Sequence, residues 1–155
     1  MTELFNLFAE QDWDNENDRD GYRHRVTAIG KRLGAELLGA SLYELPPGER
    51  TWPYHYEHAS EEWLIVVAGT PTLRTPNGEH ELRPGDVAVF PHGPAGAHQV
   101  ENRSQGNARV VIFSSKGPLD VVAYPDSRKL GVWTGDEGCV AMLRDGPRLD
   151  YWDGE

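Results

Sequence analysis

The sequence predicts an all-β sandwich or barrel. From residue 25 onward, short apolar runs that are typical of strands alternate with turn signals. The 17 glycines and 11 prolines lie mostly at the breaks between these runs. No segment has a convincing amphipathic helical pattern, which disfavours layered helix-and-sheet architectures. A length of 155 residues fits one domain.

The first 23 residues are predicted to form an arm ahead of the barrel. They are polar and acidic, and the run 12–20 is expected to be solvated rather than packed. A few apolar side chains can pin this arm to the body or to a second subunit; they are Leu4, Phe5, Leu7, Phe8 and Trp13. The barrel is predicted to cover residues 24–145, and residues 146–155 are predicted to form a C-terminal tail.

The barrel region divides into short strands joined by turns. Pro76-Asn77-Gly78 is a strong hairpin signal, and the runs 45–49 and 83–86 are also typical of tight turns. The run 62–68 is almost continuously apolar, which predicts a strand buried on both faces. The predicted strands are 25–29, 35–45, 52–58, 62–68, 71–75, 79–82, 87–90, 98–101, 108–115, 119–124, 130–133 and 139–143.

Charge and cysteine content limit the partners and the compartment. The formal net charge of −10 repels nucleic acid and disfavours anionic membrane surfaces. No apolar stretch approaches the length of a membrane span, and the N-terminus lacks the basic region of a signal peptide. The lone Cys139 cannot form an internal disulfide, so a cytoplasmic protein is expected. Because Cys139 lies in an apolar run, we expect a buried, inert thiol.

Two segments, 55–63 and 91–98, place imidazole and carboxylate groups at predicted strand ends. These groups are the ligands that divalent first-row metals prefer. Residues two apart in a strand share a face, so His55 and Glu57 can point toward one ion. Glu62 begins the next strand, and His98 can approach from across a barrel. The sequence therefore predicts one metal pocket, whereas His24, His80 and His92 are expected to be solvated or capping side chains.

These segments resemble the two motifs of the cupin superfamily. That resemblance implies a jelly-roll barrel, also called a double-stranded β-helix. The wider sequence is similar to small single-domain bacterial cupins. Compared with the family motifs, this sequence has one extra residue before His55 and two before His98. Insertions of this size in loops cost little stability. The first motif falls on Gly48, His55, Glu57, Glu62 and Gly69, and the second on Gly85, Pro91, Gly93, His98 and Asn102.

The resemblance assigns the metal ligands to His55, Glu62 and His98. Glu57 stands where the family has a second histidine, so the fourth group is either Glu57 or, through a bulge, His58. Strand periodicity favours Glu57. Two imidazoles with one or two carboxylates suit a single divalent ion, namely Mn, Fe, Ni or Zn.

Two classes of function fit these residues. By family analogy, a metal-dependent enzyme would act on a small organic molecule as a dioxygenase or an isomerase, with Glu57 as general base if it is not coordinated. The alternative is a non-catalytic module that binds or senses a small ligand, with the same residues in a hydrogen-bonded network. Small cupins tend to pair, and the apolar side chains of Leu4–Phe8 and of Tyr151 and Trp152 are expected to serve a homodimer.

Overall fold

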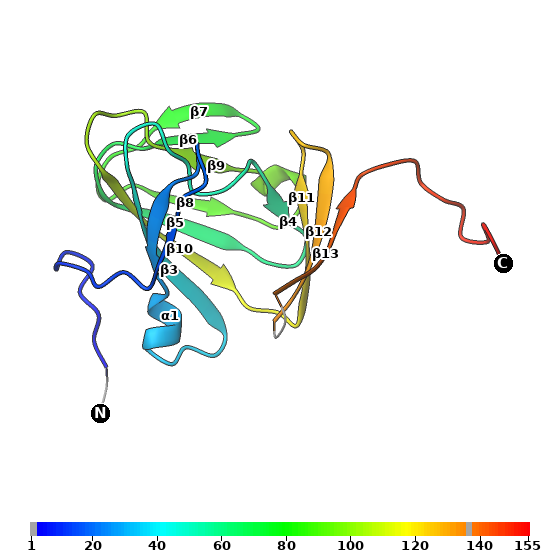
Figure 1. The fold of residues 1–155 in the computed structure, drawn as a ribbon, viewed down its shortest axis with the longest axis horizontal. Helices are drawn as coiled ribbons and strands as arrows, with labels where there is room; N and C mark the ends of the chain where they lie inside the picture. The colour runs from blue at the N-terminus through cyan, green and yellow to red at the C-terminus, as the bar shows by residue number, and fades with distance from the viewer. Residues whose placement is uncertain (1–2, 136–137) are drawn as a thin grey trace.

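The computed structural model describes residues 3–135 and 138–155, and strands dominate both ranges (Figure 1). The helical elements are one turn, α1 (Ile29–Arg32), and a 3-10 turn, η1 (Pro94–Gly96). Within the described residues, no helix combines the length and apolar character needed to cross a membrane. The strands are β1 (Asn15–Asn17), β2 (His24–Thr27), β3 (Leu38–Leu45), β4 (Tyr56–Glu57), β5 (Glu62–Ala68), β6 (Thr72–Thr75), β7 (Gly78–Glu81), β8 (Val87–Phe90), β9 (Gln99–Glu101), β10 (Ala108–Ser115), β11 (Leu119–Tyr124), β12 (Lys129–Thr134) and β13 (Gly138–Arg144).

The strands form three antiparallel sheets that close into a jelly-roll barrel, which confirms the predicted fold class. The largest sheet has the order β1-β2-β3-β10-β5-β8. A second sheet has the order β13-β12-β11-β4, and the third has the order β7-β6-β9. In Figure 1 the three-stranded sheet lies above the largest sheet, the four-stranded sheet stands at one side, and the C-terminal tail extends away from the barrel.

The main core lies between the largest and the three-stranded sheets. Alternate residues of β3, β5 and β10 point inward, as the period of two in a strand requires. Burying each such side chain stabilises the fold by about 1.5–3 kcal/mol. The core residues are Tyr43, Leu45, Leu64, Val66, Leu73, Phe90, Val100, Val110 and Ile112.

The N-terminal arm is attached to the barrel, although most side chains of the run 12–20 are exposed as predicted. Residues 15–17 form β1, which pairs with β2 in antiparallel register and was not predicted. Trp13 packs against a second cluster of buried side chains on the outer side of β3 and β10, together with Phe5 and Leu7, as expected for side chains that pin the arm to the body. The Asp14 carboxylate accepts a hydrogen bond from Arg32 Nε at 3.1 Å. The sequence did not reveal β1 because the open edge of β2 supplies its partner.

The segment 52–58 was predicted as one strand, and it is not. Only β4 is regular, and before it the chain makes isolated bridges at Arg50 and His55 to the β9 side. At β4 the chain instead pairs with β11 of the four-stranded sheet. Pro53 has no N–H to donate, which suits a crossing between sheets rather than a continuous ladder.

Two predicted burial patterns were wrong for a shared reason. We expected β5 to be buried on both faces, yet 46% of Trp63 is exposed. Cys139 was expected to be buried, and its thiol is exposed on β13. In both cases one face of the strand lacks a covering layer within the described chain.

His24 was expected to be solvated or capping, and it is buried instead. Its ring meets Tyr43 and Trp52 edge-on, at centroid distances of 5.4 and 4.9 Å. Burial lowers the pKa of this imidazole below its ordinary value. His80 and His92 are exposed, as predicted.

A buried carboxylate ties three strands of the largest sheet together. Glu44 of β3 lies opposite Arg25 of β2 and Arg109 of β10, and both guanidinium groups donate to it, Arg109 Nε at 2.7 Å. Burial alone would raise the pKa of the Glu44 carboxyl. The hydrogen bonds and charges of Arg109 and Arg25 outweigh burial and hold the pKa below its ordinary value of 4.5.

We expect Glu44→Gln to lower the free energy of unfolding by about 1–3 kcal/mol at neutral pH, because two charge-assisted hydrogen bonds are lost. Since the folded-state pKa lies below the unfolded one, this stabilisation is complete above about pH 4.5 and disappears as the pH falls through the lowered folded-state value. Urea unfolding of both proteins at several pH values measures the difference. A difference in the free energy of unfolding that stays constant down to pH 3 would contradict a lowered pKa for Glu44.

Candidate metal centre

Two histidines meet at a short backbone bridge between segments that are far apart in the sequence. His55 precedes β4, and His98 follows η1 and precedes β9. His55 N donates to His98 O at 3.2 Å, and His98 N donates to His55 O at 2.8 Å. Residues paired in this way project their side chains to the same face, and the two ring centroids lie 4.7 Å apart.

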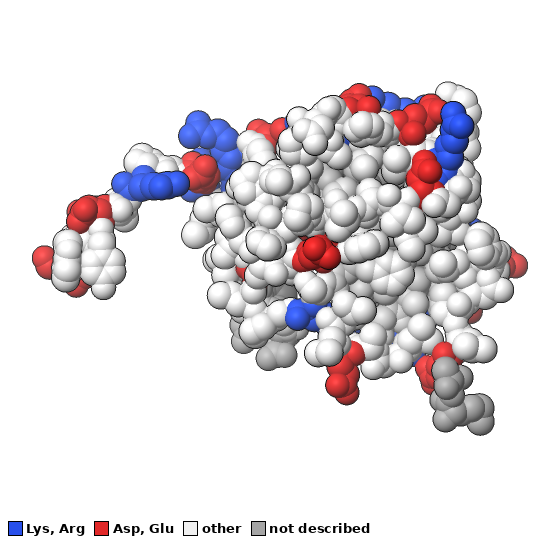
Figure 2. Space-filling model, turned by 180° about the vertical axis from the view of Figure 1, so that it is seen from behind, with Lys and Arg blue, Asp and Glu red and all other residues white. Residues whose placement is uncertain are grey.

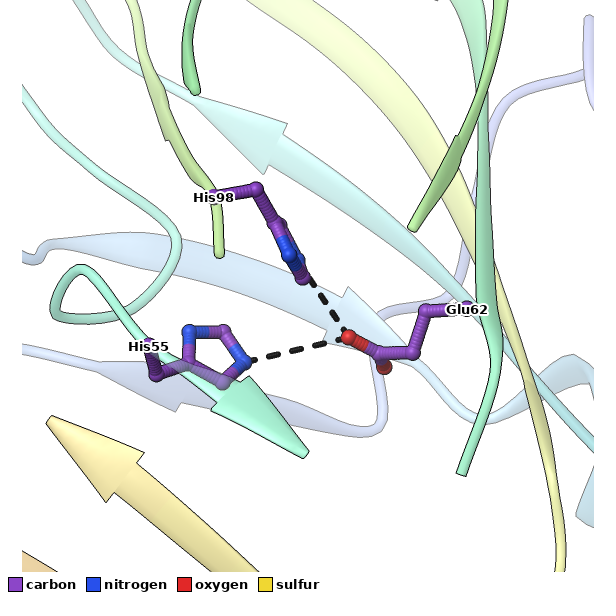
Figure 3. A group of neighbouring side chains, drawn as sticks. All are labelled: His55, Glu62 and His98. Carbon is purple, nitrogen blue, oxygen red and sulfur yellow. Dashed lines mark ion pairs between the residues drawn. The ribbon is translucent and has the colours of Figure 1, made fainter. Parts of the chain in front are cut away.

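Glu62 at the start of β5 completes a group of three possible metal ligands. Its Oε2 lies 3.3 Å from His98 Nε2 and 3.8 Å from His55 Nε2. Figure 3 shows both imidazole rings turned toward this carboxylate. Each residue offers one ligand atom, and these atoms all lie within 4.8 Å of one another. The structure thus brings together His55, Glu62 and His98 as the sequence predicted.

The hydrogen bonds of the two rings determine which nitrogen of each ring carries the proton and which presents a lone pair to Glu62. His55 Nδ1 lies 2.8 Å from the Pro53 carbonyl, and His98 Nδ1 lies 2.9 Å from the Gly96 carbonyl. A carbonyl oxygen can only accept, so each Nδ1 carries the proton and each neutral ring leaves Nε2 as an acceptor. Three acceptor atoms therefore converge, and a cation between them removes their repulsion. Backbone carbonyls that orient histidines in this way are typical of metal ligands.

The charge state of His55 also suits a ligand. Burial, followed by the neighbouring His98, lowers the pKa of the His55 imidazole to about 4. The ring is therefore neutral near pH 7, which is the form that binds a metal.

His55 and Glu62 of this group line a hollow that we call the inner cavity, of about 350 Å³. Aromatic and apolar side chains form most of its wall, as is usual for small-molecule sites. Its charged residues are all acidic, and no lysine or arginine lines it in the described part of the chain. The lining residues are Trp52, Pro53, His55, Glu57, Ser60, Glu62, Ser114, Asp120, Val122, Tyr124 and Trp133.

Glu57 lines the inner cavity but does not belong to the close group of ligand atoms among the described residues. Its Oε2 is buried and has no hydrogen-bond partner there. Burial and then the charges of Glu62 and Asp120 raise the pKa of the Glu57 carboxyl to about 8. His58, the other predicted fourth ligand, is exposed and is also outside the group. A fourth protein ligand remains a prediction.

Asp120 of β11 is a site residue that the sequence analysis missed. Its Oδ1 accepts from the backbone N–H groups of His58 and Ala59 at 3.0 and 2.9 Å. Its Oδ2 accepts from Ser60 Oγ at 2.5 Å. Asp120 thus fixes the turn between β4 and β5, which carry Glu57 and Glu62. A single aspartate in a strand gives no sequence signal for this role.

Comparison with known proteins agrees with the fold. A family model described as "Cupin domain" matches residues 41–114. A cupin superfamily structure from Silicibacter pomeroyi DSS-3, called a sugar phosphate isomerase, is 29% identical, with a TM-score of 0.75 and coverage of 85% of this chain and 82% of that one. A putative sugar phosphate isomerase from Acidithiobacillus ferrooxidans is 26% identical, with a TM-score of 0.75 and coverage of 84% and 83%.

A curated relative is similar over a shorter span. Auxin-binding protein T92 from Nicotiana tabacum is 32% identical over 117 residues, which is 70% of this chain. The chain spans only 62% of the length of that relative. The family match, the structural likeness and the jelly-roll barrel agree, and the chain belongs to the cupin superfamily.

Proposed function

We propose that His55, Glu62 and His98 bind one divalent metal ion, namely Mn, Fe, Ni or Zn. The support is the convergence of three acceptor atoms whose partner nitrogens are already held by backbone carbonyls. Two imidazoles and a carboxylate are a donor set that suits these first-row ions. A bound ion would act as a Lewis acid toward a substrate oxygen.

We expect purified protein to contain near-stoichiometric metal, and His55→Ala and His98→Ala each to lose it, because each removes one of three ligands. Elemental analysis after purification without chelators or tags measures this. His80→Ala is the matched control, because His80 is exposed on β7. Full metal content in both ligand variants, or none in the wild type after reconstitution with the four ions, would overturn the proposal.

We further propose that the protein is an enzyme of the isomerase type, which moves a proton on a small hydroxy-carbonyl compound. The carrying observation is Glu57, a buried carboxyl with an unpartnered Oε2 in the same cavity as the ligands. A carboxyl oxygen without a partner, facing the cavity, can both take a proton from a bound substrate and return it. The two relatives called sugar phosphate isomerases support the same class of reaction.

In this reaction the chain supplies position and proton transfer. Glu57 Oε2 takes the proton from the hydroxyl-bearing carbon and returns it to the former carbonyl carbon, while the hydroxyl proton moves to the former carbonyl oxygen. Asp120 keeps Glu57 and Glu62 in register by fixing the intervening turn. Trp52 and Trp133 wall the cavity and limit the access of water.

We expect Glu57→Gln to lower kcat by about 10²–10⁴-fold while metal content is unchanged, because the amide cannot accept the proton. The assay follows solvent deuterium entering aldoses, ketoses and their phosphates by NMR, in metal-loaded protein. His92→Ala is the control, because His92 is exposed outside the cavity. Unchanged exchange in Glu57→Gln would exclude Glu57 as the base. Metal and ligand binding without any exchange would instead favour a non-catalytic binding module.

We also propose that two copies of the chain pair through the outer face of β5 and β8. In this pair of strands Trp63 lies opposite Val89, and Ile65 lies opposite Val87. Trp63, Val87 and Val89 are 46%, 55% and 49% exposed, which leaves a continuous apolar strip uncovered. Figure 2 shows a broad face of the molecule on which uncharged side chains predominate, with acidic and basic groups near its middle and along its rim.

We expect light scattering to give a dimer mass at micromolar concentration and Trp63→Lys to give a monomer, because a buried, unpaired ammonium opposes pairing. Glu81→Lys on β7 is a control with the same new side chain on an exposed strand. Removal of residues 146–155, which carry the exposed Tyr151 and Trp152, tests the contribution of the tail. A monomeric wild type would contradict the proposal.

A further inference from the structure

A second hollow continues outward from the inner cavity, and we call it the vestibule. Trp52, Pro53, Tyr124 and Trp133 line both, so the two hollows adjoin at these four side chains. The vestibule has a volume of about 500 Å³ and adds residues from the N-terminal arm and from β12 and β13. Its further lining residues are Asn17, Arg19, Tyr22, Tyr54, Asp126, Ser127, Lys129 and Met142.

The two hollows carry opposite charge. The inner cavity is lined by Glu57, Glu62 and Asp120 and by no cationic side chain of the described residues. The vestibule is lined by Arg19 and Lys129 and by a single carboxylate, Asp126. A ligand that spans both hollows therefore meets carboxylates at one end and cations at the other.

The vestibule cations are free to bind an anion. Asp126 is already held by Arg74, whose two terminal nitrogens lie 2.6 and 2.9 Å from its carboxylate. Neither Arg19 nor Lys129 forms an ion pair with any residue that the structure describes. Lys129 Nζ lies 5.2 Å from the centre of the Tyr124 ring, which holds this ammonium at the junction of the two hollows.

Most other arginines of this acidic chain are not free in this sense. Carboxylates neutralise them within the described residues, whereas Arg19 and Lys129 keep their charge unpaired beside the vestibule. The paired arginines are Arg23, Arg25, Arg32, Arg50, Arg74, Arg103 and Arg109.

We infer that Arg19 and Lys129 form an anion subsite, and that the substrate is an elongated organic anion bound with its phosphate or carboxylate in the vestibule and its neutral hydroxy-carbonyl end in the inner cavity. This inference rests on the proposed function for the reaction at the inner end. The two vestibule cations attract the anionic end, and the hydroxy-carbonyl end of such a ligand then lies toward Glu57 in the inner cavity. Guanidinium and ammonium groups are the side chains that bind such anions most strongly.

The test uses three probes with the same sugar ring, namely D-glucose, D-glucose 6-phosphate and D-glucuronate, titrated by calorimetry into metal-loaded protein. We expect at least one anionic probe to bind about tenfold or more tightly than glucose, and the better one identifies the anion. The preference should weaken at high salt, because both cations are solvent-accessible. Two anionic probes that bind no more tightly than glucose, or do not bind, would overturn the inference.

Variants connect the preference to the two side chains. Arg19→Gln and Lys129→Gln should each reduce the tighter binding of the anionic probes relative to glucose. The double variant should abolish this difference without changing the affinity for glucose or the metal content. Arg83→Gln removes an exposed positive charge outside both hollows and should have no effect. A double variant that keeps the full preference would exclude this subsite.

The same titrations on protein stripped of metal with EDTA separate this inference from the proposed function. The vestibule cations do not depend on a metal, so inorganic phosphate should still bind to the stripped wild type and not to the double variant. If the protein proves to bind no metal or to lack turnover, the proposed function fails while this binding remains measurable. Loss of phosphate binding in the stripped wild type would contradict the subsite.

Discussion

The backbone bridge between His55 and His98 is the constraint on which the site depends. Its two reciprocal hydrogen bonds join a segment that crosses between sheets to the start of β9. Residues paired in this way lie with Cα atoms about 5.5 Å apart and side chains on one face. Glu62 is the first residue of β5 and lies beside the two histidines, and its pairing with Phe90 in β8 fixes that position. Elements of all three sheets therefore meet at one point.

The surroundings of the bridge orient the ligands before any ion arrives. The Pro53 and Gly96 carbonyls hold the two imidazoles, and Phe90 stacks on His98 with a centroid distance of 3.7 Å. A Cβ at Gly96 would lie 1.8 Å from the Pro91 carbonyl oxygen, so only glycine permits the close turn that presents its own carbonyl to His98. A preorganised group of acceptors loses little entropy on binding a metal, and it gives any bound substrate a fixed frame.

The resemblance to the cupin motifs was sufficient to predict that His55, Glu62 and His98 lie together, because the motifs mark each of them individually. The sequence was not sufficient to predict which side chains are buried. His24 and Trp63 were assigned the wrong environments, since the cover over each depends on segments distant in the chain. The crossing at 52–58 was missed for a related reason, since a strand-like pattern does not reveal which sheet supplies the partner. Asp120 acts through backbone N–H groups, so no motif marks it.

Glu57 stands where the family has an imidazole, and its buried carboxyl has no partner for Oε2 among the described residues. The change therefore places a possible proton carrier, in place of a third imidazole, beside His55 and Glu62 in the inner cavity. The free cations Arg19 and Lys129 lie on the N-terminal arm and on β12, outside the matched residues 41–114. The barrel thus holds the three possible metal ligands, while the flanking segments hold the two cations of the proposed anion subsite.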